Sequence, residues 1–124
     1  MSLNADTRLL RQVHPNFIQQ GRDTSMVFRP TPKDVNQLSM YHGDMISAEN
    51  AFIHYKLQLG LNSCGVLAVE VQECHNEGLI TVHDSDPYPE HCLIDFTNFS
   101  KGEIERKSKK ITQCATKRGW LYQE

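Results

Sequence analysis

Residue types that bind metal ions gather in the third quarter of the chain. Thiols, imidazoles and carboxylates occur together in the segments 73–75, 83–84 and 90–92. A tetrahedral site drawn from Cys74, His83 and His91 is geometrically conceivable. No two of these residues have the CxxC or HExxH spacing with which a turn or a helix presents two ligands together. We therefore predict turn acids and buried thiols here, with no metal site and no cofactor.

The stretch "DSDPYPEHCLIDF", residues 84–96, places acids and a histidine around two prolines. Two carboxylates such as Asp84 and Asp86 could act as general acid and base. Pro87 and Pro89 explain the same acids as turn formers. We interpret the stretch as a stiff turn that enters a core strand, in which His91 is the residue to test.

A nucleophilic centre has little support in the sequence. There is no GxSxG motif and no glycine-rich loop before a helix. Cys64 in "NSCG" lies in a predicted turn, where His42 or His54 could approach it. The simpler interpretation is a cysteine at the start of a strand, so we assign no catalytic residue and favour a protein that is not an enzyme.

A proline-framed loop, "FRPTPKD" at residues 28–34, offers a recognition surface. Arg29 could clamp a carboxylate or a phosphate with two hydrogen bonds, and Lys33 adds a second positive charge. Alternatively, Arg29 and Asp34 form a surface ion pair worth less than about 1 kcal/mol. Loops stiffened by proline suit recognition.

The turn "YHGD" follows this loop and carries Tyr41, His42 and Asp44. Our leading hypothesis is an interaction module that binds a protein partner through residues 29–44. The stretch "MYHGD" also resembles the HG element with which ADP-ribosyltransferases hold the nicotinamide ribose. This five-residue resemblance implies a nicotinamide-dinucleotide-binding role for His42, with Tyr55 and Glu70 as the nearest partners.

A second hypothesis is a domain or enzyme that binds a nucleotide or another phosphate-containing molecule. Its residues come from turns that could converge at one end of a sheet: Arg29, His42, His83, Asp84 and His91. A separation of more than about 15 Å between His42 and His91 would exclude a common pocket for one small substrate.

A third hypothesis is nucleic-acid binding by the basic C-terminal segment. Its cations are Lys101, Arg106, Lys107, Lys109, Lys110, Lys117 and Arg118, against Glu103 and Glu105. No aromatic residues are interleaved with them, so stacking on single strands is not indicated. A solvated helix face or an acidic protein partner explains the same charges.

Composition indicates one soluble globular domain spanning residues 1–124. The chain has 124 residues and a formal net charge of −2. No apolar run approaches the roughly 20 residues that cross a bilayer, and the first residues lack the apolar core of a secretory signal. We expect a cytoplasmic protein with four reduced cysteines and no membrane association. The sequence leaves a homo-oligomer open.

Periodicity predicts the elements that position these residues. Residues 4–13 predict a short helix ended by Pro15, so that residues 1–24 form a helix and flap. Residues 26–28 predict a brief extended piece, and residues 37–43 a short strand. A helix is predicted over 47–60, with Ser47 as its cap and Gly60 at its end.

The second half of the chain predicts three strands and a helix. Residues 65–73 predict the central strand, because both of its faces are mostly apolar at its start. Residues 79–84 and 91–96 predict two strands that pair. Residues 100–119 predict a helix that begins with a capping box, followed by the apolar anchor "WLY". The expected fold is α+β: a mostly antiparallel sheet of four to five strands with two main helices on one face.

Six segments, taken in order and spacing, resemble a family of short uncharacterised bacterial proteins. They are "RQVHPNFI", "FRPTPKD", "LSMYHGDMISAENAF", "GVLAVEV", "PEHCLIDF" and "RGWLY". The similarity spans the chain from about Arg11 to Tyr122. It implies a bacterial or phage origin and one compact domain, and it brings no activity or catalytic residues.

Overall fold

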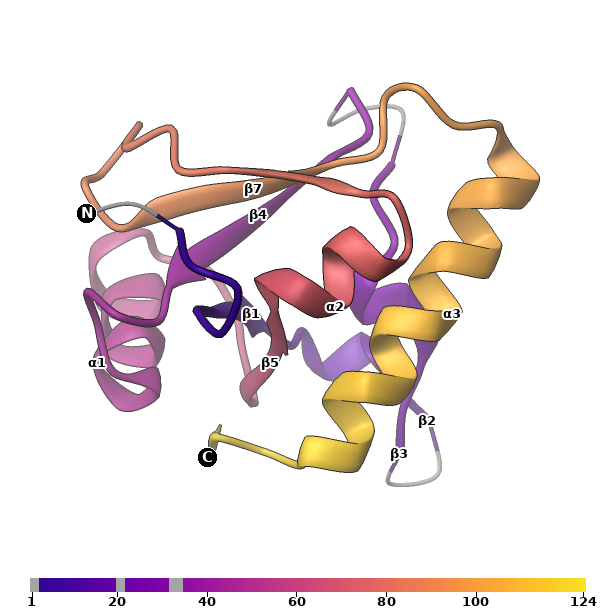
Figure 1. Ribbon diagram of the computed structural model, residues 1–124. Coiled ribbons are helices and arrows are strands. Elements are labelled where there is room, and N and C mark those ends of the chain that lie inside the picture. Colours follow the sequence, from indigo (N-terminus) through magenta and orange to yellow (C-terminus); the bar gives the residue numbers. More distant parts are fainter. Residues whose placement is uncertain (1–2, 20–21, 32–34) are drawn as a thin grey trace.

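The computed structural model describes residues 3–19, 22–31 and 35–124. Within these residues the chain forms a six-stranded antiparallel sheet with the strand order β6-β7-β4-β1-β5-β8 (Figure 1). The strands are β1 (Arg8–Gln12), β4 (Gln37–His42), β5 (Gly65–Glu70), β6 (Ile80–Val82), β7 (His91–Asp95) and β8 (Tyr122–Gln123). A small ribbon pairs β2 (Ile18–Gln19) with β3 (Arg22–Asp23). The predicted α+β class and antiparallel sheet are confirmed, with six strands in place of four to five.

Two helices begin where the sequence predicts. The helix α1 (Ala48–Ile53) starts after Ser47, whose hydroxyl accepts from the Asn50 N–H at 3.1 Å, and continues as the π-helical segment η4 (His54–Gln58). The helix α3 (Lys101–Arg118) starts with a capping box of Ser100 and Glu103. None of the helices in the described part of the chain is both long and apolar enough to span a bilayer.

The helix α2 (Val71–Asn76) was not predicted. The predicted strand ran to Glu73, whereas β5 ends at Glu70 and the chain turns there into α2. A capping box causes the change, because the side chains of Glu70 and Glu73 each accept from the other's backbone N–H. Glutamate is not among the residues preferred at a helix N-cap, so Glu70 did not mark a helix start in the sequence.

Each face of the sheet has its own apolar core. On β5, Leu67 and Val69 belong to the larger core, which includes Ile111 of α3, whereas Val66 and Ala68 belong to the smaller core under α1. Successive side chains of a strand point to opposite faces. The helices α1 and α3 therefore cover opposite faces and lie on opposite sides of the molecule (Figure 1). The prediction that both helices pack on one face was wrong.

The N-terminal helix prediction was also wrong, because residues 8–12 form a strand at the centre of the sheet. β1 pairs with β5 over five residue pairs and with β4 at Leu9↔His42 and Leu10↔Tyr41. Leu9 enters the larger core and Leu10 the smaller one. Leu9, Leu10 and Val13 can share one helix face, but adjacent leucines fit equally well a strand that is buried on both sides.

Of the remaining predicted elements, some are confirmed and others were wrong. The pairing of residues 79–84 with 91–96 is confirmed by β6 and β7. The extended piece at 26–28 was wrong, because residues Ser25–Phe28 form a 3-10 helix, η2, that buries Val27 and Phe28. A second 3-10 turn, η1 (Pro15–Phe17), precedes β2. β5 is an inner strand but lies second from the edge, so β4 and β1 hold the central place predicted for it.

The C-terminal anchor is confirmed. Trp120 packs against the larger core, while Leu121 and Tyr122 pack against the smaller one. β8 then pairs Tyr122 with Val66 of β5. The end of the chain thus closes one edge of the sheet.

The central place of β1 predicts the effect of truncating Leu9. Leu9 is fully buried, so Leu9→Ala should lower the free energy of unfolding by about 2–5 kcal/mol. Leu57→Ala is the matched control, because Leu57 is exposed and should change stability by less than about 0.5 kcal/mol. Urea denaturation followed by circular dichroism measures both. Equal stabilities of the two variants would contradict the central strand.

Candidate functional site

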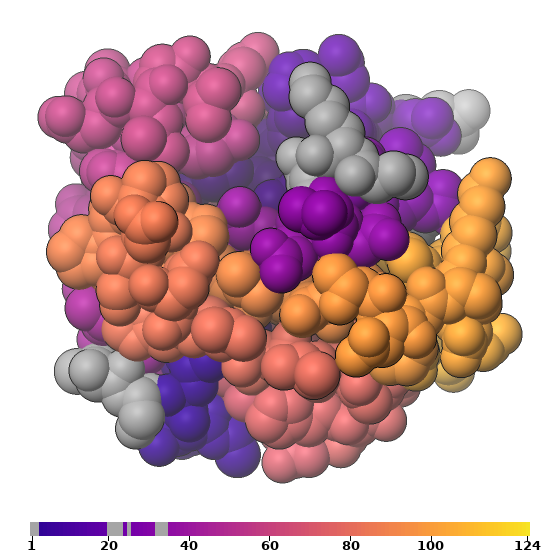
Figure 2. Space-filling view, turned by 90° about the horizontal axis from the view of Figure 1, so that it is seen from above, coloured from indigo at the N-terminus to yellow at the C-terminus, as the bar shows by residue number. Residues whose placement is uncertain are grey.

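A cavity of about 490 Å³ lies between the sheet, the segment from α1 to residue 61, and the loop at residues 83–90. Figure 2 looks onto this side, where a hollow lies between the pink α1 region and the orange segment that leads into β7. The lining residues come from β1, β4, β7 and η4, from the segment that follows η4, and from the loop at residues 83–90. Pockets of this size accept small organic molecules.

Three tyrosines line the cavity: Tyr41 on β4, Tyr55 on η4 and Tyr88 in the loop. The rings of Tyr41 and Tyr88 stack with centroids 5.2 Å apart. The Tyr41 hydroxyl lies 2.7 Å from Nδ1 of His54. The π-helical turn matters here, because it carries both His54 and Tyr55, and such turns often occur at functional sites.

The phenols of Tyr41 and Tyr88 are held in their neutral form. Burial, followed by the neighbouring Tyr88, raises the pKa of Tyr41 above its ordinary value. Burial likewise raises the pKa of Tyr88, while a hydrogen bond with Tyr41 lowers it in part. Burial disfavours the phenolate because the charged form loses its hydration. Both hydroxyls therefore present a proton at neutral pH.

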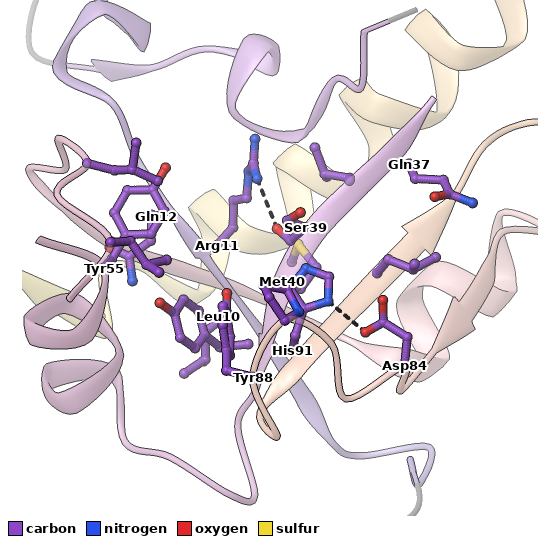
Figure 3. A pocket seen from close by; sticks show the side chains of 16 residues that line it. Leu10, Arg11, Gln12, Gln37, Ser39, Met40, Tyr55, Asp84, Tyr88 and His91 are labelled. Carbon is purple, nitrogen blue, oxygen red and sulfur yellow. Dashed lines mark hydrogen bonds and ion pairs between the residues drawn. The ribbon is translucent and has the colours of Figure 1, made fainter. Parts of the chain in front are cut away.

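A histidine–aspartate pair lines the same cavity. His91 begins β7, and its Nδ1 lies 2.6 Å from Oδ1 of Asp84 (Figure 3). The loop brings them together, because the N–H of Ser85 donates to the His91 carbonyl at 3.2 Å and the His91 N–H donates to the Tyr88 carbonyl at 3.0 Å. A carboxylate at Nδ1 fixes the tautomer with the proton on Nδ1, which leaves Nε2 as an acceptor. Nε2 makes no hydrogen bond within the described chain.

Two residues of β1 complete the polar lining. Arg11 donates from Nη1 to the Ser39 carbonyl at 2.9 Å (Figure 3). Its Nε donates to the Val27 carbonyl at 2.8 Å. Gln12 is buried, and its Oε1 accepts from the Ser63 hydroxyl at 2.8 Å. The Nε2 of Gln12 is buried without a hydrogen-bond partner among the described residues. Sequence reasoning missed both residues, because only the strand register places them beside β4.

The predicted common pocket divides into two clusters on opposite faces. Tyr41 is the Cα partner of His91, so His42 is one position away, but its side chain points to the other face. The His42 ring lies 4.9 Å from that of His83, and His83 Nε2 lies 2.7 Å from the Pro89 carbonyl. Of the five residues named for one pocket, the structure brings Asp84 beside His91 and His42 beside His83, and these two pairs lie on opposite faces of the sheet.

The proposed partner surface at residues 29–44 is partly buried. Tyr41 and His42 are 2% and 0% exposed. Nδ1 of His42 accepts from the Asp44 N–H at 3.2 Å, and the Asp44 carboxylate accepts from the Thr7 hydroxyl at 2.7 Å. These residues hold the turn together. Lys33 lies outside the described residues.

Arg29 and Cys74 lie apart from the cavity. Arg29 pairs with Glu105 of α3 at 3.4 Å. Cys74 is buried in the larger core, and burial raises the pKa of its thiol to about 12. Among the described residues no three metal-ligating side chains lie close enough to hold an ion. Burial also raises the pKa of Cys64, which disfavours the reactive thiolate.

The geometry does not reproduce the site implied by the HG resemblance. His42 is fully buried on the face of the larger core, whereas Tyr55 lines the cavity on the opposite face. Glu70 caps α2 and lies 4.0 Å from Arg118. The three residues are thus engaged in separate contacts.

Neither models of protein families, nor curated proteins, nor solved structures gave a match to this chain. The function is therefore argued from the geometry of the site.

The raised pKa of Tyr41 predicts how stability depends on alkaline pH. Because the folded pKa lies above the unfolded value, this contribution is complete below about pH 10 and is lost as the pH rises further, by about 1.4 kcal/mol per pH unit. Tyr41→Phe should cost about 1 kcal/mol at neutral pH through the lost hydrogen bond to His54. The gap between wild type and variant should then shrink above pH 10. Urea denaturation from neutral pH to above pH 10 measures the free energy of unfolding of both proteins. A constant difference between them over this range would contradict the raised pKa of Tyr41.

Proposed function

We propose that the protein binds a small, uncharged, partly apolar organic molecule in the tyrosine-lined cavity. The observation that carries the proposal is the convergence of three tyrosines and the Asp84–His91 pair on one cavity of about 490 Å³. Aromatic walls with a few placed polar groups are typical of sites for small molecules. This proposal develops the second sequence hypothesis and replaces its phosphate-binding chemistry.

The charges around the cavity favour an uncharged ligand over a phosphate. Among the described lining residues, Arg11 is the only lysine or arginine, and its guanidinium donates to the carbonyls of Val27 and Ser39. Asp84 adds a negative charge. A nucleotide phosphate would enter this cavity without the arginine fork or helix terminus that usually binds it.

The polar groups favour a ligand that both accepts and donates hydrogen bonds. Nε2 of Gln12 is a buried donor with no partner in the described chain, and a carbonyl oxygen would satisfy it. Nε2 of His91 offers an acceptor at the same cavity. Leu59 and Leu61 supply an exposed apolar rim, which suits the hydrocarbon part of the ligand.

The other two hypotheses have less support. In the protein-binding hypothesis, residues 29–44 contact the partner, but Tyr41 and His42 are buried and cannot take part in such a surface. For nucleic-acid binding, two cations of α3 are used internally: Arg118 donates to Glu73 at 2.8 Å, and Lys107 donates to the Glu77 carbonyl. The exposed lysines that remain fit a solvated helix face.

Binding of an uncharged aromatic ketone tests the proposal. Acetophenone titrated into labelled protein should shift the amide signals of Ser39, Tyr41 and His91 in a saturable way. Benzoate and inorganic phosphate should bind at least about tenfold more weakly. Equal or stronger binding of phosphate, or shifts confined to residues outside the cavity, would contradict the proposal.

Two matched variants test whether the ligand binds in the cavity. Ser39→Phe should fill the cavity and reduce acetophenone affinity at least about tenfold. Thr97→Phe adds the same ring at an exposed position outside the cavity and should leave binding unchanged. If both variants bind as wild type does, the ligand lies elsewhere.

A further inference from the structure

A serine that took no part in the sequence hypotheses lies beside the histidine–aspartate pair. Ser39 on β4 is exposed and lines the cavity together with His91 and Asp84. Its hydroxyl makes no hydrogen bond within the described chain, although its carbonyl accepts from Arg11. Figure 3 draws Ser39 and His91 on neighbouring strands of the cavity. The serine hydroxyl is therefore available to a bound molecule.

The strand register places Ser39 and His91 on the same face. The Cα partners across β4 and β7 are Ser39↔Leu93 and Tyr41↔His91. Partners across an antiparallel pair point to one face, and so do residues two apart along a strand. Ser39 and His91 are thus diagonal neighbours, whose Cβ atoms are separated by about 7–8 Å or less. A serine hydroxyl and the Nε2 of a histidine can meet across that gap by side-chain rotation.

We propose that Ser39, His91 and Asp84 form a hydrolytic centre that cleaves small uncharged carboxylic esters. The proposal rests on the ligand-binding function above and names the ligand class as ester. Asp84 holds His91 through Nδ1, at 2.6 Å, so that Nε2 faces the cavity as a base. Catalytic hydrogen bonds are often long or absent before substrate binds, so the nucleophile and the base need not touch in the unbound protein.

The reaction balances with water as the only co-reactant. His91 Nε2 takes the proton of Ser39 as Oγ attacks the ester carbonyl carbon, which forms a tetrahedral oxyanion. The C–O bond to the alcohol then breaks, and His91 returns the proton to the departing alkoxide. Water, deprotonated by His91, attacks the acyl-serine ester. The carboxylic acid leaves, and Ser39 recovers its proton.

Gln12 supplies a donor for the oxyanion. The register Leu10↔Tyr41 continued by two residues sets Gln12 opposite Ser39 on the same face. The two strands separate at this point, and cavity space lies between them. Gln12 lines the same cavity, and its buried Nε2 has no partner in the described chain, so rotation of this side chain toward Ser39 offers the oxyanion a donor. In this site Ser39, His91 and Gln12 are catalytic residues, and Asp84 is a positioning residue.

Turnover of 4-nitrophenyl acetate and 4-nitrophenyl butyrate tests the proposal. Wild type and the control Thr97→Ala should hydrolyse these esters at equal rates, because Thr97 is exposed outside the cavity. Ser39→Ala and His91→Gln should each lose about a hundredfold or more. Gln12→Met should lose about tenfold or more in turnover with little change in stability, because the Ser63 hydroxyl also donates to the Gly65 carbonyl at 2.9 Å.

Covalent labelling identifies the nucleophile. A fluorophosphonate probe should add one adduct to the wild type, mapped to Ser39 by peptide mass spectrometry, and none to Ser39→Ala. Asp84→Asn should keep the fold but lose the fixed tautomer of His91, visible as a change in its imidazole ¹⁵N signals, with a shifted pH profile of turnover. A label on another residue, or undiminished turnover in Ser39→Ala, would overturn the proposal.

The ketone titration separates this proposal from the function on which it rests. If acetophenone binds the cavity but no ester is turned over and no adduct forms, the hydrolytic centre is wrong and ligand binding stands. If His91→Gln abolishes turnover while Ser39→Ala retains it, His91 activates water directly and the nucleophile assignment fails. If acetophenone does not bind the cavity, the binding function itself fails.

Discussion

The strands β1 and β4 separate after two residue pairs, and the site depends on this separation. The two strands pair only at Leu9↔His42 and Leu10↔Tyr41, although β1 continues to pair with β5 over five residue pairs. Beyond that point the carbonyl of Ser39 would lack a ladder partner, and the guanidinium of Arg11 satisfies it together with the Val27 carbonyl. Arg11 therefore bridges the Ser39 and Val27 carbonyls across an opening in the middle of the sheet. The cavity extends into this opening.

The unequal cover of the two faces explains why the cavity lies on one side. The larger core receives side chains from α2, α3 and η2, and it closes that face. On the other face α1 packs over β1, β5 and β8, and the outer part of β4 and β7 is covered by the 83–90 loop. A helix and a loop leave a gap that a second long helix would fill. Since α1 and α3 do not share a face, the prediction of one helical layer concealed this asymmetry.

Caps and periodicity made α1 and α3 predictable, whereas burial on both faces hid the strand β1. Ser47 and Ser100 marked helix starts because their hydroxyls satisfy backbone N–H groups there. Leu9 and Leu10 carried no alternation, because each faces a different core. In a sheet with two apolar sides, adjacent residues are both buried, and the sequence then fits a short helix as well as a strand.

The candidate site could be found from sequence only where the chain folds back locally. Asp84 and His91 were both named, because a proline-stiffened turn of a few residues brings them together. Ser39 and Gln12 were missed, since a polar residue inside a strand has no local signal and its neighbours depend on register across β4, β7 and β1. His42 was named as a binding residue, whereas its contacts in the structure hold the strand and the turn together. It is fully buried, and its backbone N–H and Nδ1 serve the strand and the turn.

Not every buried polar atom without a partner points to a ligand, and position decides which ones do. Four such atoms occur among the described residues, on Gln12, Arg29, His42 and Ser108. Only Gln12 belongs to the described cavity lining, so its amide is the one of the four groups that a side-chain rotation can bring to a bound molecule. Leaving that N–H unpaired costs about 1–3 kcal/mol in the empty protein, and a ligand oxygen placed there recovers the cost on binding.

The amide of Gln12 stabilises a negatively charged oxygen more than a neutral carbonyl oxygen, because an ionised acceptor roughly doubles the strength of a hydrogen bond. An amide held in this way therefore favours a developing oxyanion over the ground state, which is the requirement for catalysis rather than binding alone.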